Sequence, residues 1–190
     1  DRRNFSTVRD SLRLKQQAEE EYASAHDGFV PELAAEMDKL ARADVLVLSF
    51  PLWWLGMPAI LKGWVDRVFA LGRAYGGGRY YDRGVFAGKR AMCAITVGGS
   101  SAAYSEFGLY GPLEATLYPI HHGILAFTGF SVVEPFVVHG PARLREEDRQ
   151  QRLLHFVEPL RMIDALPVLE APSTADYSGM VKIPPVVAVT

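Results

Sequence analysis

The sequence predicts an α/β fold in which an open, twisted parallel β-sheet is flanked by helices. Short continuous apolar runs, which are typical of buried parallel strands, occur at residues 44–50, 89–97 and 130–138. Segments with helical periodicity fill the chain between and around these runs. Strands that alternate with helices favour one open parallel sheet.

The amino-terminal part of the chain predicts two helices before the first visible strand. Residues 12–25 are rich in charged helix formers and predict an exposed helix. Pro31 opens a second helix over 31–43, because proline is well tolerated at the first helical position. Its apolar residues recur at the spacing of one helical face, and the strand at 44–50 follows directly.

The middle of the chain predicts a long helix, a loop and a second strand. Pro58 begins a helix predicted over 58–75. Residues 75–84 are rich in glycine and predict a flexible loop outside the packed core, which leads to the strand at 89–97.

The last part predicts a helix at 112–128, the third strand at 130–138 and a helix at 144–158. The apolar positions of the final helix include Leu153, Leu154 and Phe156. The large apolar side chains expected in the core are Trp64, Phe69, Phe130 and Phe136.

Length, charge and cysteine content exclude several classes of protein. The 190 residues suit one domain over 1–166, with 167–190 as an arm that packs on a partner or is poorly ordered. A net charge of -2 offers no footprint for nucleic acid. No apolar run approaches the roughly 20 residues of a membrane helix, so no membrane insertion is expected. The single Cys93 excludes a disulfide framework and is expected to be a buried hydrophobe in a cytoplasmic protein.

Two loops after predicted strands have an unusual composition. The sequence "FPLWWLG" follows the first strand, and "VGGSSAAY" follows the second. In open parallel sheets, ligands bind beyond the carboxyl ends of the strands. Trp53 and Trp54 either cover an edge of the core or form a stacking wall for a planar cofactor.

The second loop suits the same planar ligand. Gly98 and Gly99 lack side chains, so their backbone allows a ligand to approach closely. Tyr104 could direct its hydroxyl toward a developing charge. A planar, redox-active ring between the two loops suggests a flavin.

Other site motifs do not fit the sequence. The segment "AGKR" at 87–90 lacks the spacing of a phosphate-binding P-loop. His121 and His122 are adjacent, so on a helix they point about 100° apart and cannot chelate one metal ion together. No metal site is expected, and both histidines are interpreted as structural or surface residues.

The segments "FPLWWLGMPAILKGWVDRVFALGRAY", "ITVGGSSAAYSEFGLYG", "YPIHHGILAFTGF" and "VVEPFVVHG" together resemble the flavodoxin-like NAD(P)H:quinone oxidoreductase (DT-diaphorase) family. The resemblance covers about residues 5–150 in order. It implies a flavodoxin-like sheet, a homodimer with its active site at the interface, and FAD as cofactor, with FMN as the alternative. It also implies that the family's first strand and phosphate-binding loop precede residue 1, so we expect the natural protein to be longer.

The resemblance further implies the roles of individual residues. The loop lining the flavin ring matches Pro51, Leu52, Trp53, Trp54 and Leu55, and the loop on its pyrimidine side matches Thr96, Val97, Gly98 and Gly99. Tyr104 matches a tyrosine that stabilises the reduced flavin, and Arg149 matches a basic residue near the adenine half. Trp54, Gly98 and Gly99 also border the quinone pocket, to which the second subunit adds Tyr75 and Phe127. Two positions depart from the family: Tyr110 replaces its active-site histidine, and Gly77 replaces a second pocket tyrosine.

The function implied is a ping-pong, two-electron reaction. NAD(P)H would give a hydride to flavin N5, and a quinone or similar planar acceptor would then take it from the same slot. Tyr104 and Tyr110 are the candidate catalytic residues. The alternatives are a flavin-binding regulatory subunit of a membrane transport system, a one-electron flavodoxin carrier and a purely structural dimer.

Overall fold

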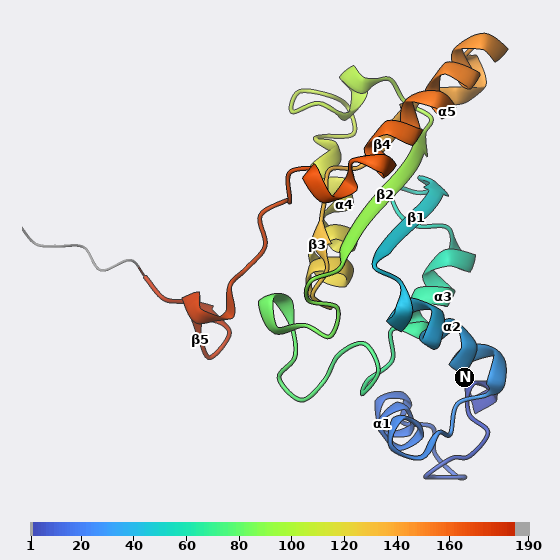
Figure 1. Cartoon of the computed structure of the whole chain (residues 1–190), viewed down its shortest axis with the longest axis vertical. Helices are drawn as coiled ribbons and strands as arrows, with labels where there is room; N and C mark the ends of the chain where they lie inside the picture. The colour runs from blue at the N-terminus through green and yellow to red at the C-terminus, as the bar shows by residue number, and fades with distance from the viewer. Residues whose placement is uncertain (1, 185–190) are drawn as a thin grey trace, which may run out of the picture.

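The sheet of the computed structural model, which describes residues 2–184, is parallel throughout (Figure 1). Strand β2 (Arg90–Val97) is central, with β1 (Val45–Pro51) on one side. Its other side pairs with both β3 (Ser131–Val132) and β4 (Phe136–His139). The alternating pattern of the sequence therefore predicted the fold class correctly.

The third predicted strand is split into two. β3 pairs with the start of β2 and β4 with its end, so both lie in one line along the same neighbour. Residues 133–135 separate them, and Pro135 has no backbone N–H to contribute to a sheet ladder.

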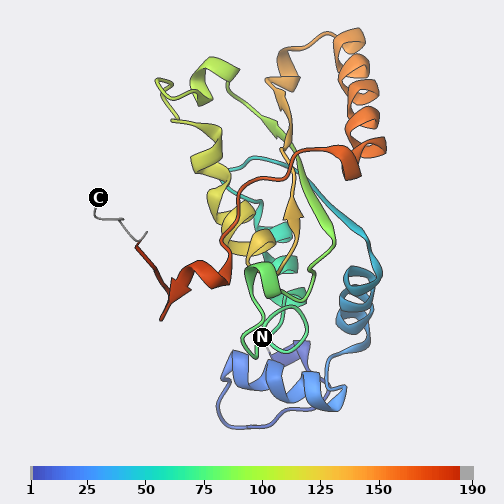
Figure 2. The same cartoon turned by 60° about the vertical axis from the view of Figure 1, so that its left-hand side comes forward.

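Helices cover both faces of the sheet. α4 (Leu113–Ile120) and α5 (Glu146–Arg161) lie on opposite sides (Figure 2). Consecutive residues of β2 show the same division, because Cys93 belongs to the main core and Met92 to a second cluster beside Phe156 of α5. α1 (Gln16–His26), α2 (Pro31–Arg42) and α3 (Ala59–Val68) contribute buried residues to the main core.

The third helix is shorter than the sequence predicted, ending at Val68 rather than at residue 75. The carboxylate of Glu20 accepts the backbone N–H of Leu71 at 2.9 Å, which replaces an intrahelical partner. Gly72 then adopts a φ of 88°, which a right-handed helix does not allow.

The middle of the glycine-rich loop, at residues 77–79, is exposed as predicted, whereas the tyrosines on either side pack against the core. Tyr75 and Tyr81 are partly buried against the main core. The backbone N–H of Tyr81 also donates to the carbonyl of Phe127 at 2.9 Å. A short 3₁₀ turn (Tyr81–Arg83) follows, so the tyrosines hold a loop that its glycines alone would leave mobile.

The final helix buries less than its apolar residues predicted. Leu153 and Leu154 are 69% and 62% exposed. Phe156 packs on Phe136 of β4, with ring centroids 4.9 Å apart. Of the predicted core residues, Phe69 and Phe130 are buried, whereas Trp64 and Phe136 are partly buried.

The carboxyl-terminal arm crosses the edge of the sheet. The N–H of Leu169 donates to the carbonyl of Val132 at 2.7 Å, and a small hairpin of β5 (Tyr177–Ser178) and β6 (Val181–Lys182) follows. The rest of the predicted arm, 185–190, lies outside the described residues.

Cys93 is fully buried, and burial raises the pKa of its thiol to about 12, as expected of a structural cysteine. Within residues 2–184, no helix has both the length and the apolar character required to cross a lipid bilayer.

Candidate functional site

The two unusual loops lie side by side at the carboxyl ends of β1 and β2. Pro51 stands opposite Thr96 in the parallel register, and the N–H of Leu52 donates to the carbonyl of Thr96 at 2.8 Å. Because both loops continue from paired strand ends, Trp54 and Gly98 extend from the same edge of the sheet.

The tryptophan loop is a tight and strained turn. Trp53 and Gly56 exchange backbone hydrogen bonds of 2.9 and 3.0 Å. The residues between them, Trp54 and Leu55, have φ values of 51° and 53°, a left-handed conformation that costs a side-chain-bearing residue about 1–2 kcal/mol. Trp54 is nevertheless 94% exposed. A strained turn that holds an indole in solvent at this edge is typical of a ligand site.

The two glycines of the second loop have different surroundings. A Cβ on Gly99 would lie 2.9 Å from the ring of Tyr104 and 3.1 Å from that of Tyr110, so the protein's own packing requires glycine there. A Cβ on Gly98 would meet nothing within 4 Å. Of these two glycines, it is therefore Gly98 that presents bare backbone to open space.

The rings of Tyr104 and Tyr110 pack against each other beside this loop. Their ring centroids are 5.1 Å apart, and the ring of His139 lies 6.2 Å from that of Tyr104. Burial, with a smaller contribution from Tyr110, raises the pKa of Tyr104. Its hydroxyl therefore keeps its proton at neutral pH and remains a hydrogen-bond donor.

Arg143 is a site residue that the sequence analysis missed. Its guanidinium donates to the carbonyl of Gly98 at 2.7 Å and packs against Gly140, where a Cβ would lie 2.5 Å from Nη2. The predicted basic residue, Arg149, lies on the surface of α5, where it pairs with Glu146 at 3.2 Å. Only the position of Arg143 shortly after the third strand could have indicated it.

A second aromatic cluster lies at the other end of the sheet. The rings of Tyr75 and Phe127 are 5.9 Å apart, and Tyr80, also missed by the sequence analysis, stacks on Phe127 at 6.2 Å and 8°. These residues belong to segments that precede β2 and β3, whereas Trp54 follows β1. One chain therefore does not bring Tyr75 and Phe127 to the tryptophan loop.

The adjacent histidines have separate environments. His122 Nε2 hydrogen-bonds the hydroxyl of Tyr81 at 2.9 Å, and its ring stacks on Tyr118 at 4.5 Å. His121 Nε2 is buried without a partner. In the described part of the chain, no group of three or more His, Cys, Asp and Glu side chains could hold a metal ion.

We expect the stability of the protein to fall as the pH drops from 6.5 toward 4, in part because of His121. Burial lowers the pKa of His121 from 6.5 to about 4, although nearby Glu114 acts in the opposite direction. The unfolded chain therefore takes up a proton in this window before the folded chain does, and folding loses on the order of 2 kcal/mol. Urea unfolding of the protein and of His121→Gln at pH 7 and pH 5 measures this. An unchanged pH dependence in the variant would contradict it.

A parallel sheet with a strained aromatic turn and a bare glycine backbone at its carboxyl edge is typical of a doubly wound α/β protein with a candidate ligand site at that edge. A family model described as having a flavodoxin-like fold matches residues 5–160. The chain therefore belongs to the flavodoxin-like family, and its relatives there include quinone-type NAD(P)H dehydrogenases.

Three relatives illustrate the comparison. The chain is 38% identical over 167 residues to NAD(P)H dehydrogenase (quinone) 1 of Rattus norvegicus, covering 87% of this chain but 61% of that protein. A Klebsiella pneumoniae structure, classed provisionally as a quinone reductase, superposes with a TM-score of 0.84 at 34% identity and covers 88% of this chain and 68% of that one. The structure of general stress protein 14 of Treponema denticola, in complex with FMN, superposes with a TM-score of 0.56 at 28% identity. The match covers 71% of this chain and 73% of that one.

Proposed function

We propose that the protein is a flavin-dependent NAD(P)H:quinone oxidoreductase that transfers two electrons in a ping-pong reaction. The observation that carries this proposal is the pairing of the strained Trp54 turn with the open backbone of Gly98 at one sheet edge. The names of the relatives supply the reaction class. This chain spans less than two thirds of the rat protein, so the activity of the whole protein is part of the proposal.

The residues of this edge are compatible with a flavin ring. A Cβ on Gly98 would meet nothing within 4 Å, so the protein leaves the side of this residue open to a planar group, and the exposed indoles offer apolar stacking area. We propose that the ring is held by Pro51, Leu52, Trp53, Trp54 and Leu55 together with Thr96, Val97, Gly98 and Gly99. Arg149 would lie near the adenine half of the cofactor. FAD is our first choice, and the FMN bound by the T. denticola protein keeps FMN as the alternative.

The chain's own groups would bind and polarise the reactants. When bound, the flavin would take a hydride from NAD(P)H and deliver it to the quinone. Tyr104 keeps a hydroxyl donor beside the glycine loop, and Tyr110, the position for which the family resemblance implies a histidine, packs against it. Arg143 would fix the Gly98 carbonyl and add positive charge at the same edge.

We further propose a cytoplasmic homodimer. Tyr75 and Phe127 lie too far along the sheet to face Trp54 of the same chain, so a second chain would have to supply them. Exposed apolar side chains near the proposed site, including Phe107 at 94% and Leu109 at 89%, also favour a covering partner. Native mass spectrometry of the purified protein should then show twice the mass of one chain.

Steady-state turnover tests the function directly. The flavin-loaded protein should oxidise NAD(P)H with a simple benzoquinone as acceptor, and the double-reciprocal plots should be parallel. Bound flavin without any turnover would overturn the enzyme proposal. It would favour the regulatory flavin-binding subunit instead.

Tyr104→Phe should slow flavin reduction by about a hundredfold while the flavin remains bound. Loss of one well-placed donor to a developing negative charge is worth about 3 kcal/mol in such sites. Stopped-flow absorbance measures the rate, and the ring of phenylalanine preserves the packing on Gly99. Tyr118→Phe, in α4, serves as the control. A wild-type rate in Tyr104→Phe would remove Tyr104 from the catalytic role.

A further inference from the structure

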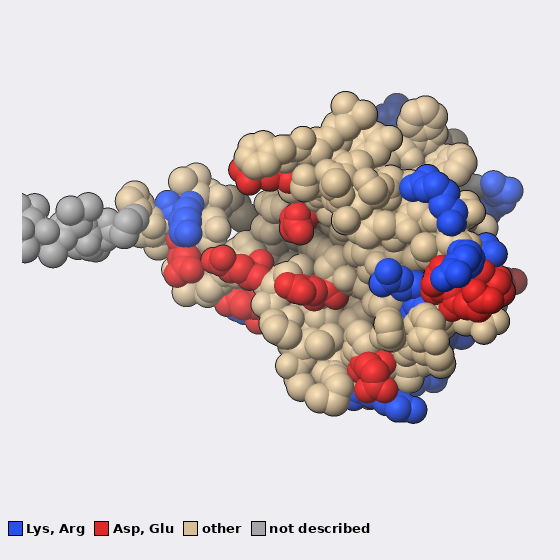
Figure 3. Space-filling view, turned by 90° about the horizontal axis from the view of Figure 1, so that it is seen from above, with Lys and Arg blue, Asp and Glu red and all other residues tan. Residues whose placement is uncertain are grey.

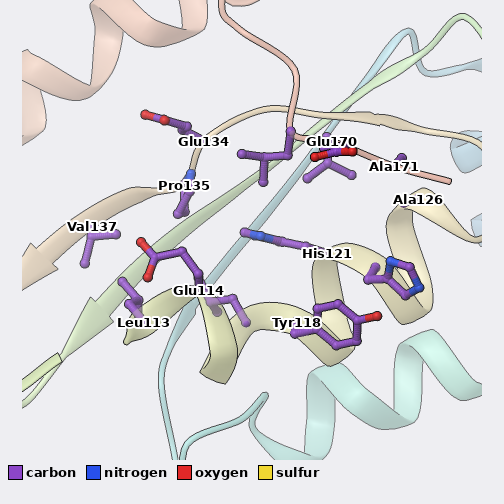
Figure 4. A pocket seen from close by; sticks show the side chains of 14 residues that line it. Leu113, Glu114, Tyr118, His121, Ala126, Glu134, Pro135, Val137, Glu170 and Ala171 are labelled. Carbon is purple, nitrogen blue, oxygen red and sulfur yellow. The ribbon is translucent and has the colours of Figure 1, made fainter. Parts of the chain in front are cut away.

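A cavity of about 390 Å³ lies outside the proposed flavin site. It opens between α4, the junction of β3 and β4, and the arm at residues 169–171 (Figure 4). None of its lining residues belongs to the loops at 51–55 or 98–104. Its volume falls within the range of small-molecule sites, and its apolar lining includes Leu117, Val132 and Leu169.

Three carboxylates from three different elements surround this cavity. Glu114 comes from α4, Glu134 from the β3–β4 junction and Glu170 from the arm (Figure 4). All three are exposed, and no ion pair described within residues 2–184 involves any of them. Seen from above, acidic side chains occupy the middle of the face, whereas many Lys and Arg lie toward α5 (Figure 3). The cavity therefore has a local negative charge that the protein does not neutralise.

A buried polar atom without a partner faces the same space. The imidazole of His121 points from the end of α4 into the cavity (Figure 4), and its Nε2 makes no hydrogen bond. Buried polar atoms without partners are rare in folded proteins, and a bound group is one explanation of such an atom. Burial lowers the pKa of His121 to about 4, so the ring is neutral near pH 7. A neutral imidazole can accept a hydrogen bond from an incoming N–H.

We propose that this cavity binds a small organic cation that has an apolar body and N–H donors, such as an amidinium or a protonated amine. The apolar walls would bury the body of the ligand. Glu114, Glu134 and Glu170 would balance its charge, and His121 Nε2 would accept one of its N–H groups. Anions of the same shape are disfavoured because three carboxylates would repel them.

Calorimetric titration of the purified full chain at pH 7 tests this proposal with benzamidine as the probe. Benzamide has nearly the same shape without the charge, and benzoate reverses the charge. We expect saturable binding of benzamidine at least tenfold tighter than that of either comparison compound. Raising the salt concentration should weaken it.

Variants identify the groups that bind. Glu114→Gln combined with Glu134→Gln should weaken benzamidine binding at least tenfold, and His121→Leu should weaken it as well. Glu158→Gln is the matched control, because Glu158 is an exposed glutamate that pairs with Arg161 on α5, and the affinity of this variant should match that of the wild type.

Equal binding of benzamidine and benzamide by the wild type would overturn the proposal. Unchanged affinity in the folded Glu114/Glu134 variant would also overturn it. Circular dichroism establishes folding, and if that variant fails to fold, the wild-type comparison of the three compounds decides. None of these readouts depends on flavin or on turnover.

Discussion

Gly84→Ala is expected to lower the free energy of unfolding by about 3–4 kcal/mol, one of the largest effects of any single methyl group in this chain. A Cβ at position 84 would lie 2.4 Å from both N and Cα of Gly129 and 2.5 Å from the carbonyl carbon of Thr128. All three are backbone atoms, so no side-chain rotation can relieve the overlap.

The contact is reciprocal, which makes relaxation harder. A Cβ on Gly129, whose φ is 105°, would lie 2.8 Å from Cα and the carbonyl carbon of Gly84. The two glycines therefore let the loop before β2 pack directly on the turn before β3. The N–H of Phe86 confirms the closeness of the segments, because it donates to the carbonyl of Thr128 at 2.9 Å.

Gly63→Ala is the matched control, and it should raise the free energy of unfolding rather than lower it. Gly63 lies inside α3, and an added Cβ would meet nothing within 4 Å. Alanine is favoured over glycine in a helix interior, so stability should rise by about 1 kcal/mol. Urea unfolding followed by far-ultraviolet circular dichroism measures both variants. If Gly84→Ala proved as stable as the wild type, the close backbone packing would be wrong.

The elements that were predictable are those whose signal is local. Buried parallel strands are recognised from continuous apolar runs, and α2 from the spacing of Leu33, Met37 and Leu40, all three buried. Strand order then places the loops after β1 and β2 at one edge, so the neighbourhood of Trp54 and Gly98 follows from topology.

The features that sequence reasoning missed depend on partners far along the chain. The end of α3 is set by Glu20, which bonds Leu71 fifty-one residues later. Arg143 reaches Gly98 across forty-five residues. Leu153 and Leu154 have helical spacing, but spacing alone does not reveal whether another surface covers them. No local pattern encodes these outcomes.

Gly98 and Gly99 show how local sequence and long-range packing combine at the candidate site. The sequence assigned Gly98 and Gly99 the same purpose, close approach of a ligand to bare backbone. The structure gives Gly99 a separate reason, because the rings of Tyr104 and Tyr110 occupy the space of its missing side chain. Tyr110 reaches this position because its N–H bonds the carbonyl of Ala103 at 3.0 Å, which returns the chain to the loop.

Gly98→Val should consequently weaken flavin binding, whereas Gly99→Ala should lower the stability of the protein. The isopropyl group introduced by Gly98→Val would extend into the space proposed for the flavin, while its Cβ meets no protein atom within 4 Å. For Gly98→Val we expect the free energy of unfolding to be nearly unchanged. Its flavin affinity should fall at least a hundredfold, which corresponds to about 2.7 kcal/mol. Gly99→Ala should instead lower stability by about 1–2 kcal/mol, because the rings of Tyr104 and Tyr110 must move.

Two measurements on each variant separate these expectations. Fluorescence titration of the flavin gives the dissociation constant, and thermal unfolding without flavin gives the stability of the protein alone. Tyrosine fluorescence should change in Gly99→Ala and remain as in the wild type in Gly98→Val. If Gly98→Val bound flavin as tightly as the wild type, the ring could not lie against Gly98. The carboxyl edge of β1 and β2 would then lose its role as the flavin site, even with the fold intact.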